Sequence, residues 1–307
     1  MDNMGKTGSI KTVWQLPHPP IVVPEVGHGR EREIAATLDA MRAAAASIAG
    51  SGADALIVIS PHAPAFGGII TINGSESLKG DLSRFGAPGA DVEFNGDADT
   101  AGLIYEEAEL FGIRTSLIID SARNAGATAG PAGARNLHKG AGARGARSGG
   151  VLDHGSVVPL YFISEAYKKL GAVPPKLIVI SIAYLENKEL HAFGGCIARA
   201  VQKSGVCAAL VTSGDLSHKL TEDGPYGYDP AGPEFDLFVI DIIKKQNITQ
   251  LMATDEITLD RAAQCGFYGL LIAYGALEEL NMKGAATPRV LSYEGTFGVG
   301  YAIAQIF

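Results

Sequence analysis

The stretch that decides the fold is Asp54–Pro64, DALIVISPHAP. Its apolar run, Ala55–Ile59, has the length and unbroken hydrophobicity of a strand buried on both faces of a mostly parallel sheet. The run ends in Ser-Pro-His-Ala-Pro, and because proline cannot continue a central strand, the chain must turn there. His62 is therefore predicted at the carboxyl end of a core strand, the edge at which open α/β sheets bind ligands. From this stretch alone, His62 fits a metal ligand and a solvated turn histidine equally well.

The same arrangement recurs in two other places. A strand predicted at Val13–Leu16 runs into Pro17-His18-Pro19, and an apolar strand predicted at Cys207–Thr212 opens into Ser-Gly-Asp-Leu-Ser-His, which ends at His218. The recurrence of this pattern in one chain argues against accident, and each of these histidines is predicted near a strand end, where open α/β sheets keep their ligand sites.

Helices alternate with these strands. Between the first two strands, apolar residues recur at spacings of three and four over Arg30–Ala49, which predicts an amphipathic helix and a β-α-β unit with parallel strands. We expect a single α/β domain over residues 13–307, with a central mostly parallel or mixed sheet flanked by helices, after a flexible N-terminus (1–12). The other predicted helices are 97–111, 156–170, 187–203, 233–245 and 260–280, and the other strands are 69–72, 113–119, 176–182, 290–293 and 298–306.

Two segments are predicted as loops. Residues 75–95 are polar and rich in glycine. More than half of residues 123–150 are Gly or Ala, several are Arg, and none is acidic. Such a segment cannot bury enough apolar surface to offset its ordering entropy, so we expect a flexible loop in which His138 is solvated.

Composition narrows the function classes. The 307 residues are 47% hydrophobic and carry a net charge of −8, which argues against a general nucleic-acid binder. No apolar run approaches the roughly 20 residues of a membrane helix, and the N-terminus lacks the apolar core of a signal peptide, so a cytoplasmic protein is predicted. Cys196, Cys207 and Cys265 are scattered without a CxxC pair, so neither a disulfide framework nor a thiolate zinc site is indicated.

The residues that carry chemistry are four histidines and one glutamate. His18, His62, His154 and His218 fall in turns, and Glu294 stands in Ser-Tyr-Glu-Gly beside an apolar strand, where an unpaired carboxylate is costly. Two imidazoles and one carboxylate form the facial triad of non-haem Fe(II) oxygenases. The pattern favours a metal site, and a histidine-based hydrolase remains the alternative.

Other polar residues have simpler interpretations. His28 is expected in solvent and His191 on a helix surface. Asp215 and Asp153 either orient the histidines near them or bond to the turn backbone, as aspartate commonly does.

Five motifs, in order along the chain, resemble those of class III extradiol ring-cleavage dioxygenases. They are LPHPPIVVPEVG, VISPHAP, LDHGSVVPLYFI, SGDLSHKLTEDGPYG with PEFD, and SYEGTFGVGYAIA. The chain is most similar to the LigB-like domain of AmmeMemoRadiSam system proteins, related to the catalytic subunit of protocatechuate 4,5-dioxygenase. Memo proteins and DOPA dioxygenases resemble it more distantly.

The resemblance implies specific roles. His18, His62 and Glu294 would be the metal ligands, His218 the acid/base residue, and His154 a second active-site histidine. The implied cofactor is Fe(II), with zinc or another divalent metal as an alternative, and the implied substrates are a small aromatic diol of the catechol type and O2. The implied assembly is a homodimer, with a small accessory subunit as a further partner.

One departure from the family pattern leaves other functions open. The family's Cys-Gly-(His/Arg)-Arg-Ser segment is replaced here by Cys265-Gly266-Phe267-Tyr268-Gly269, so the substrate of relatives does not transfer directly. The alternatives to a dioxygenase are a Memo-like metal-binding scaffold that binds a partner with little catalysis, and a non-oxidative metal-dependent enzyme on the same site.

Overall fold

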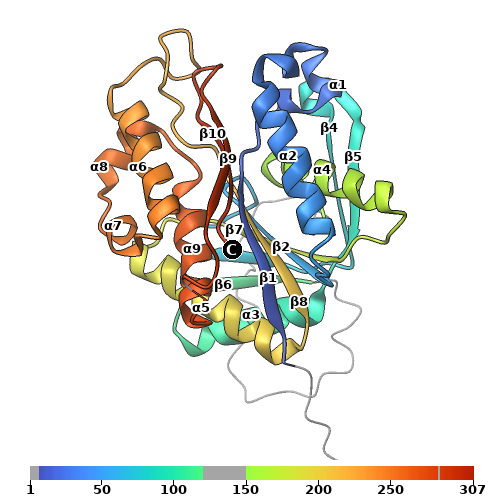
Figure 1. Ribbon diagram of the computed structural model, residues 1–307. Helices are drawn as coiled ribbons and strands as arrows, with labels where there is room; N and C mark the ends of the chain where they lie inside the picture. Colours follow the sequence, from blue (N-terminus) through green and yellow to red (C-terminus); the bar gives the residue numbers. More distant parts are fainter. Residues whose placement is uncertain (1–6, 120–149, 283) are drawn as a thin grey trace, which may run out of the picture.

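A computed structural model describes residues 7–119, 150–282 and 284–307. These residues form a single α/β domain around an eight-stranded sheet of order β6-β3-β7-β2-β8-β1-β10-β9, with a separate hairpin, β4-β5 (Figure 1). The strands are β1 (Ser9–Leu16), β2 (Ala55–Ser60), β3 (Ile70–Asn73), β4 (Ser77–Leu82), β5 (Ala87–Asn95), β6 (Thr115–Ile118), β7 (Lys176–Ser181), β8 (Cys207–Ser213), β9 (Arg289–Glu294) and β10 (Tyr301–Gln305).

The centre of the sheet is parallel, as predicted. Strands β7, β2, β8 and β1 run in one direction, while β10 pairs antiparallel with both β1 and β9, and β3 antiparallel with β7. Strand β8 lies between β1 and β2, so these two strands are parallel but do not pair directly. The carboxyl ends of β1, β8 and β2 therefore meet at one edge.

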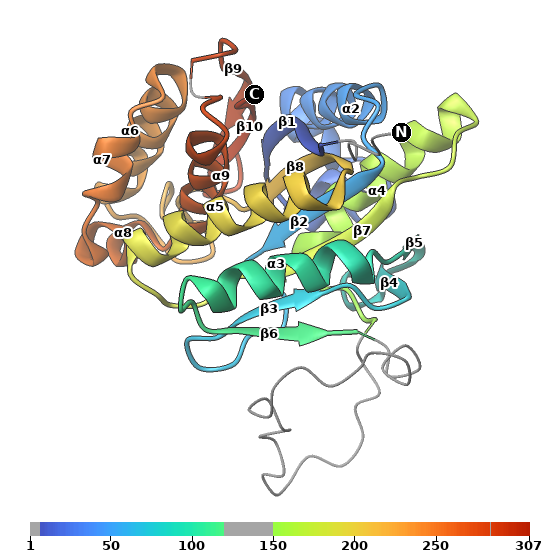
Figure 2. The ribbon, with the colours of Figure 1, turned by 90° about the horizontal axis from the view of Figure 1, so that it is seen from below.

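Helices cover both faces of the sheet (Figures 1 and 2). One core contains side chains from α2, α4 and the hairpin, and the other contains side chains from α3, α5, α6 and α9. The helices are α1 (Pro24–Gly27), α2 (Ala35–Ala49), α3 (Ala98–Leu110), α4 (His154–Leu170), α5 (Asn187–Ser204), α6 (Ala231–Lys245), α7 (Ile248–Met252), α8 (Glu256–Ala262) and α9 (Phe267–Glu279), with 3-10 turns η1 (Pro20–Val22), η2 (Arg30–Ile34) and η3 (Ser83–Phe85).

The prediction of a surface loop over residues 75–95 was wrong. This segment forms the β4-β5 hairpin, in which Leu78 pairs with Phe94. Leu78, Leu82, Val92 and Phe94 alternate with exposed or half-buried residues, and this period of two buries one face of the hairpin in the core with α4. The intervening polar and glycine residues had concealed the alternation.

The single helix predicted over residues 260–280 was also wrong. Helix α8 ends at Ala262, Ala263 adopts a left-handed backbone with φ of 50°, and α9 begins at Phe267. The backbone N–H groups of Cys265 and Gly266 both donate to the carbonyl oxygen of Asp215. The break therefore holds Cys265 against the segment that follows β8.

Two further predictions concern the start of the first strand and the flexible loop at residues 123–150. Strand β1 begins at Ser9, four residues earlier than predicted, because it pairs with β8 from Cys207 onward. The predicted flexible loop lies outside the described residues except for Gly150. Among the described helices, none is long and apolar enough to cross a membrane.

Helices α5 and α9 pack with their backbones in contact, and this contact predicts the cost of adding a methyl group. A Cβ built at Gly275 would lie 1.9 Å from the carbonyl oxygen of His191. We expect Gly275→Ala to lower the free energy of unfolding by about 1–3 kcal/mol, because neither helix can withdraw without opening the core. Gly102→Ala on α3, where nothing lies within 4 Å, should instead raise it by about 0.5–1 kcal/mol through helix propensity. Urea unfolding of both variants measures these changes in the free energy of unfolding. Equal changes in the two variants would contradict the prediction.

Candidate metal centre

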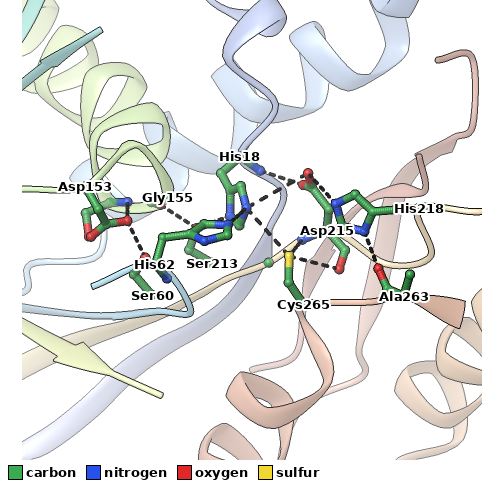
Figure 3. Close-up of polar contacts among 12 residues, drawn as sticks. His18, Ser60, His62, Asp153, Gly155, Ser213, Asp215, His218, Ala263 and Cys265 are labelled. Atoms are coloured by element: carbon green, nitrogen blue, oxygen red, sulfur yellow. Dashed lines mark hydrogen bonds and ion pairs between the residues drawn. The ribbon is translucent and has the colours of Figure 1, made fainter. Parts of the chain in front are cut away.

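The edge where β1, β8 and β2 end collects the predicted histidines. His18 follows β1 by two residues, His62 follows β2 by two residues, and His218 lies beyond the end of β8. A fourth histidine, His154, is the first residue of α4 and lies against this edge. Figure 3 shows His18 and His62 meeting in the middle of the group, with His218 on the far side of Asp215.

Three side-chain atoms lie close enough to hold one metal ion. The Nε2 atoms of His18 and His62 are 3.1 Å apart, and the Sγ of Cys265 is 3.6 Å from the Nε2 of His18. In the part of the chain that the structure describes, this is the group of three His, Cys, Asp or Glu residues whose donor atoms all lie within 4.8 Å of one another. Two imidazole nitrogens about 2.1 Å from one ion, and a thiolate about 2.3 Å from it, have separations of this size. The three residues therefore fit a metal ion.

His18 is held in the neutral form that ligation requires. Its side chain is buried, and burial lowers its pKa well below the usual range, with a further lowering from the imidazoles of His62 and His154. Its backbone N–H donates to Oδ1 of Asp215 at 2.8 Å. The ring nitrogen Nδ1 lies 2.9 Å from the hydroxyl of Ser213.

His62 and His154 form a stacked pair. Their ring centroids are 4.4 Å apart, and the ring of His154 also meets that of His18 edge-on at 5.4 Å. Burial lowers the pKa of both His62 and His154, and the Asp153 carboxylate opposes the lowering in each. Asp153 caps α4 by accepting the N–H of Ser156 and also accepts the hydroxyl of Ser60 at 2.6 Å. Through these bonds, the start of α4 is fixed to the end of β2.

His218 presents one unprotonated nitrogen. Its Nδ1 lies 2.6 Å from the carbonyl oxygen of Ala263, which can only accept, so Nδ1 carries the hydrogen and Nε2 holds the lone pair. Burial lowers the pKa of His218, and the bond to Ala263 opposes that effect. The ring of Tyr226 packs edge-on against it at 5.7 Å. His218 is therefore arranged as a proton acceptor at Nε2.

Asp215 lies between the two histidines. Its Oδ2 is 4.0 Å from the Nε2 of His18 and 4.0 Å from the Nε2 of His218. Burial raises the pKa of this carboxyl to about 7, although the hydrogen bond from the His18 backbone opposes the rise. The Asp215 carboxylate thus bonds to the backbone of the turn after β1, at His18, and approaches both imidazoles.

Glu294 is placed differently from the histidines. It ends β9, and its Oε2 accepts both the backbone N–H and the hydroxyl of Thr37, each at 2.6 Å, in the first turn of α2. Cys265 supplies the third donor atom that lies within 4.8 Å of the ring nitrogens of His18 and His62. Sequence reasoning missed Cys265 because it sought paired cysteines. The available signal was a lone Cys-Gly preceding an apolar helix.

A hollow of about 970 Å³ leads to the histidines. Its lining residues come from the β4-β5 hairpin and the start of α4, and they include His62 and His154. The ring of Phe85, 40% exposed on the hairpin turn, lies 5.4 Å from that of His154. The hollow is large enough for a small aromatic molecule.

Comparison with known proteins places the chain in a family. Protein CA_C1420 of Clostridium acetobutylicum is 36% identical over 300 residues, which cover 97% of this chain and 58% of that protein, so the chain spans less than two thirds of this relative's length. The crystal structure of the uncharacterized protein JW3007 from Escherichia coli K12 matches with a TM-score of 0.55 and 14% identity over 97% of this chain and 100% of that one, a likeness of fold alone. The family model described as the catalytic LigB subunit of aromatic ring-opening dioxygenase matches residues 12–304, and the chain belongs to this family.

Proposed function

We propose that this protein is a metal-dependent dioxygenase that opens the ring of a catechol-type diol with O2. The observation that carries the proposal is the convergence of four histidines at one sheet edge, with the Nε2 atoms of His18 and His62 only 3.1 Å apart. Membership of the LigB family supports the same chemistry. The finer assignment to the AmmeMemoRadiSam-associated group rests on the sequence motifs.

His18, His62 and Cys265 would hold the metal. Fe(II), when bound, would supply electrons and open coordination positions for a diol and O2. Because burial raises the pKa of the Cys265 thiol well above its usual range, binding must displace the thiol proton. Glu294, the ligand implied by the family resemblance, stays a prediction for the third position.

The surrounding residues would bind the diol and move its proton. Nε2 of His218 would accept a phenolic proton, because Nδ1 is committed to Ala263. The stacked rings of His62 and His154, with Phe85 facing His154, would form flat walls for an aromatic ring in the hollow.

Cys265 favours a second candidate function. A thiolate beside two imidazoles is a soft donor set that suits zinc or copper(I) better than the carboxylate of a facial triad would. The alternatives are thus a non-oxidative metal-dependent enzyme or a Memo-like metal-binding scaffold on the same site.

Oxygen uptake separates these candidates. Protein loaded anaerobically with Fe(II) should consume O2 with at least one member of a catechol panel and give a yellow ring-opened product. His218→Gln should keep the metal and lose about 10²–10⁴-fold in rate, since it removes the proton acceptor. His28 is exposed and has a left-handed backbone, which asparagine tolerates. His28→Asn should therefore leave the rate unchanged. Bound zinc with no uptake would support the second candidate.

The assembly and location implied by the family resemblance remain proposals. They are a homodimer, a small accessory subunit and a cytoplasmic location. Light scattering on the purified chain measures the first, and co-purification from the native host measures the second.

A further inference from the structure

Among the residues that the structure describes, the hydroxyl of Ser213 is the hydrogen-bond partner of Nδ1 of His18. Ser213 ends β8 and is fully buried. Its Oγ lies 2.9 Å from Nδ1 of His18 and 2.5 Å from the carbonyl oxygen of Gly155. Both contacts are within hydrogen-bond distance, so the direction of each bond determines where the protons are.

Proton counting fixes these directions. A serine hydroxyl has one hydrogen, and a carbonyl oxygen can only accept. The Ser213 hydrogen is therefore donated to Gly155, and the remaining contact requires Nδ1 of His18 to donate to Oγ. His18 then carries its proton on Nδ1 and has its lone pair on Nε2, the atom that faces His62 and Cys265.

The acceptor at the end of this chain of bonds is itself held in place. Gly155 lies in the first turn of α4, next to His154. A Cβ at this position would lie 2.6 Å from Oγ of Ser60 and 3.2 Å from Cδ2 of His62, so only glycine fits. The carbonyl of Gly155 thus cannot move away from Ser213 without disturbing the residues around His62.

We propose that Ser213 is a positioning residue that holds His18 in the Nδ1–H tautomer and directs its Nε2 lone pair to the metal position. The inference rests on the proposed metal centre. Ligating histidines usually donate their second ring N–H to a carboxylate, a carbonyl or water, and losing that partner costs 10–100-fold in metal affinity. Here a hydroxyl has this role, and it also ties the end of β8 to the start of α4.

The test compares two buried serines that end parallel strands on either side of β2, Ser213 on β8 and Ser181 on β7. Ser213→Ala should weaken Zn(II) binding, measured by chelator competition, by about 10–100-fold. Ser181→Ala removes a similarly buried hydroxyl at the end of β7, which accepts the N–H of Thr71 at 2.8 Å, and should leave Zn(II) affinity unchanged. Urea unfolding of both variants shows whether each remains folded and how their stability losses compare.

A second measurement needs no metal. In ¹⁵N-histidine NMR spectra of the metal-free protein, with His18 assigned through His18→Gln, the wild type should show the proton on Nδ1, and Ser213→Ala should show the Nε2–H form or a mixture. If the variant keeps the Nδ1–H form and binds Zn(II) like the wild type, the role of Ser213 is disproved while the metal centre stands. If wild-type protein binds no metal at all, the metal centre fails and the inference with it. If the wild type binds metal but opens no ring, and Ser213→Ala changes the tautomer of His18, the role of Ser213 is supported and only the proposed dioxygenase activity is rejected.

Discussion

Cys265→Ser is expected to release the bound metal, whereas Glu294→Gln is expected to keep it. The Sγ of Cys265 lies 3.6 Å from Nε2 of His18, while the carboxylate of Glu294 accepts two hydrogen bonds from Thr37. Losing a direct ligand should lower Zn(II) affinity by more than the roughly 10–100-fold typical of an outer partner. Chelator competition on the purified variants measures the change.

The two variants are matched because each replaces one candidate ligand by a near-isostere. Glu294→Gln should reduce the free energy of unfolding by about 0.3–1 kcal/mol, since it removes a negative charge from the first turn of α2. If the family resemblance gives the third ligand correctly, the outcome reverses, and Glu294→Gln loses the metal while Cys265→Ser retains it. Affinity in the wild type should rise with pH, because the thiol whose pKa burial raises must lose its proton to bind.

The strand-end argument accounts for the parts of the site that sequence could predict. Apolar runs that stop at proline or glycine identified β2, β1 and β8, and parallel pairing brings His18 and His62 to one edge. This inference depends only on the rule that carboxyl ends of parallel strands are neighbours. It needed no knowledge of how the side chains are oriented.

The features that sequence reasoning missed depend on contacts distant along the chain. At the break between α8 and α9, the backbone N–H groups of Cys265 and Gly266 bond to Asp215. Cys265 lies 50 residues after Asp215 in the sequence, so no local propensity encodes that contact. For the same reason the Cys-Gly pair at Cys265 did not reveal that its thiol lies beside His18. The hairpin at 75–95 was missed because polar and glycine residues interrupt the period-two pattern of its apolar residues.

Asp236→Asn should make the protein markedly more resistant to unfolding above pH 7. Asp236 on α6 is fully buried, and burial raises its pKa from 3.8 to about 7. The folded state therefore binds a proton that the unfolded state releases between these two values, so the contribution of Asp236 to stability is complete below pH 3.8 and is lost as pH rises through 7. This pKa shift corresponds to a loss of up to about 4 kcal/mol in the free energy of unfolding of the wild type.

Asparagine should avoid this loss because it can make the same contacts as the neutral acid. Asp236 accepts the N–H of Ser217 at Oδ1, and its other oxygen lies 2.8 Å from the hydroxyl of Tyr293, to which the Asn amide can donate. In urea unfolding of the metal-free protein from pH 4 to 8, the stability of Asp236→Asn relative to wild type should rise up to pH 7 and then level off. Asp229→Asn is the control, since Arg261 lowers the pKa of the half-buried Asp229 from 3.8. Asp229 is largely ionised in both the folded and the unfolded state from pH 4 to 8, so the stability difference between Asp229→Asn and the wild type should stay nearly constant over this range. A pH-independent difference for Asp236→Asn would mean that its carboxyl stays ionised in the folded protein, and the buried charge would then need a partner other than Ser217 and Tyr293.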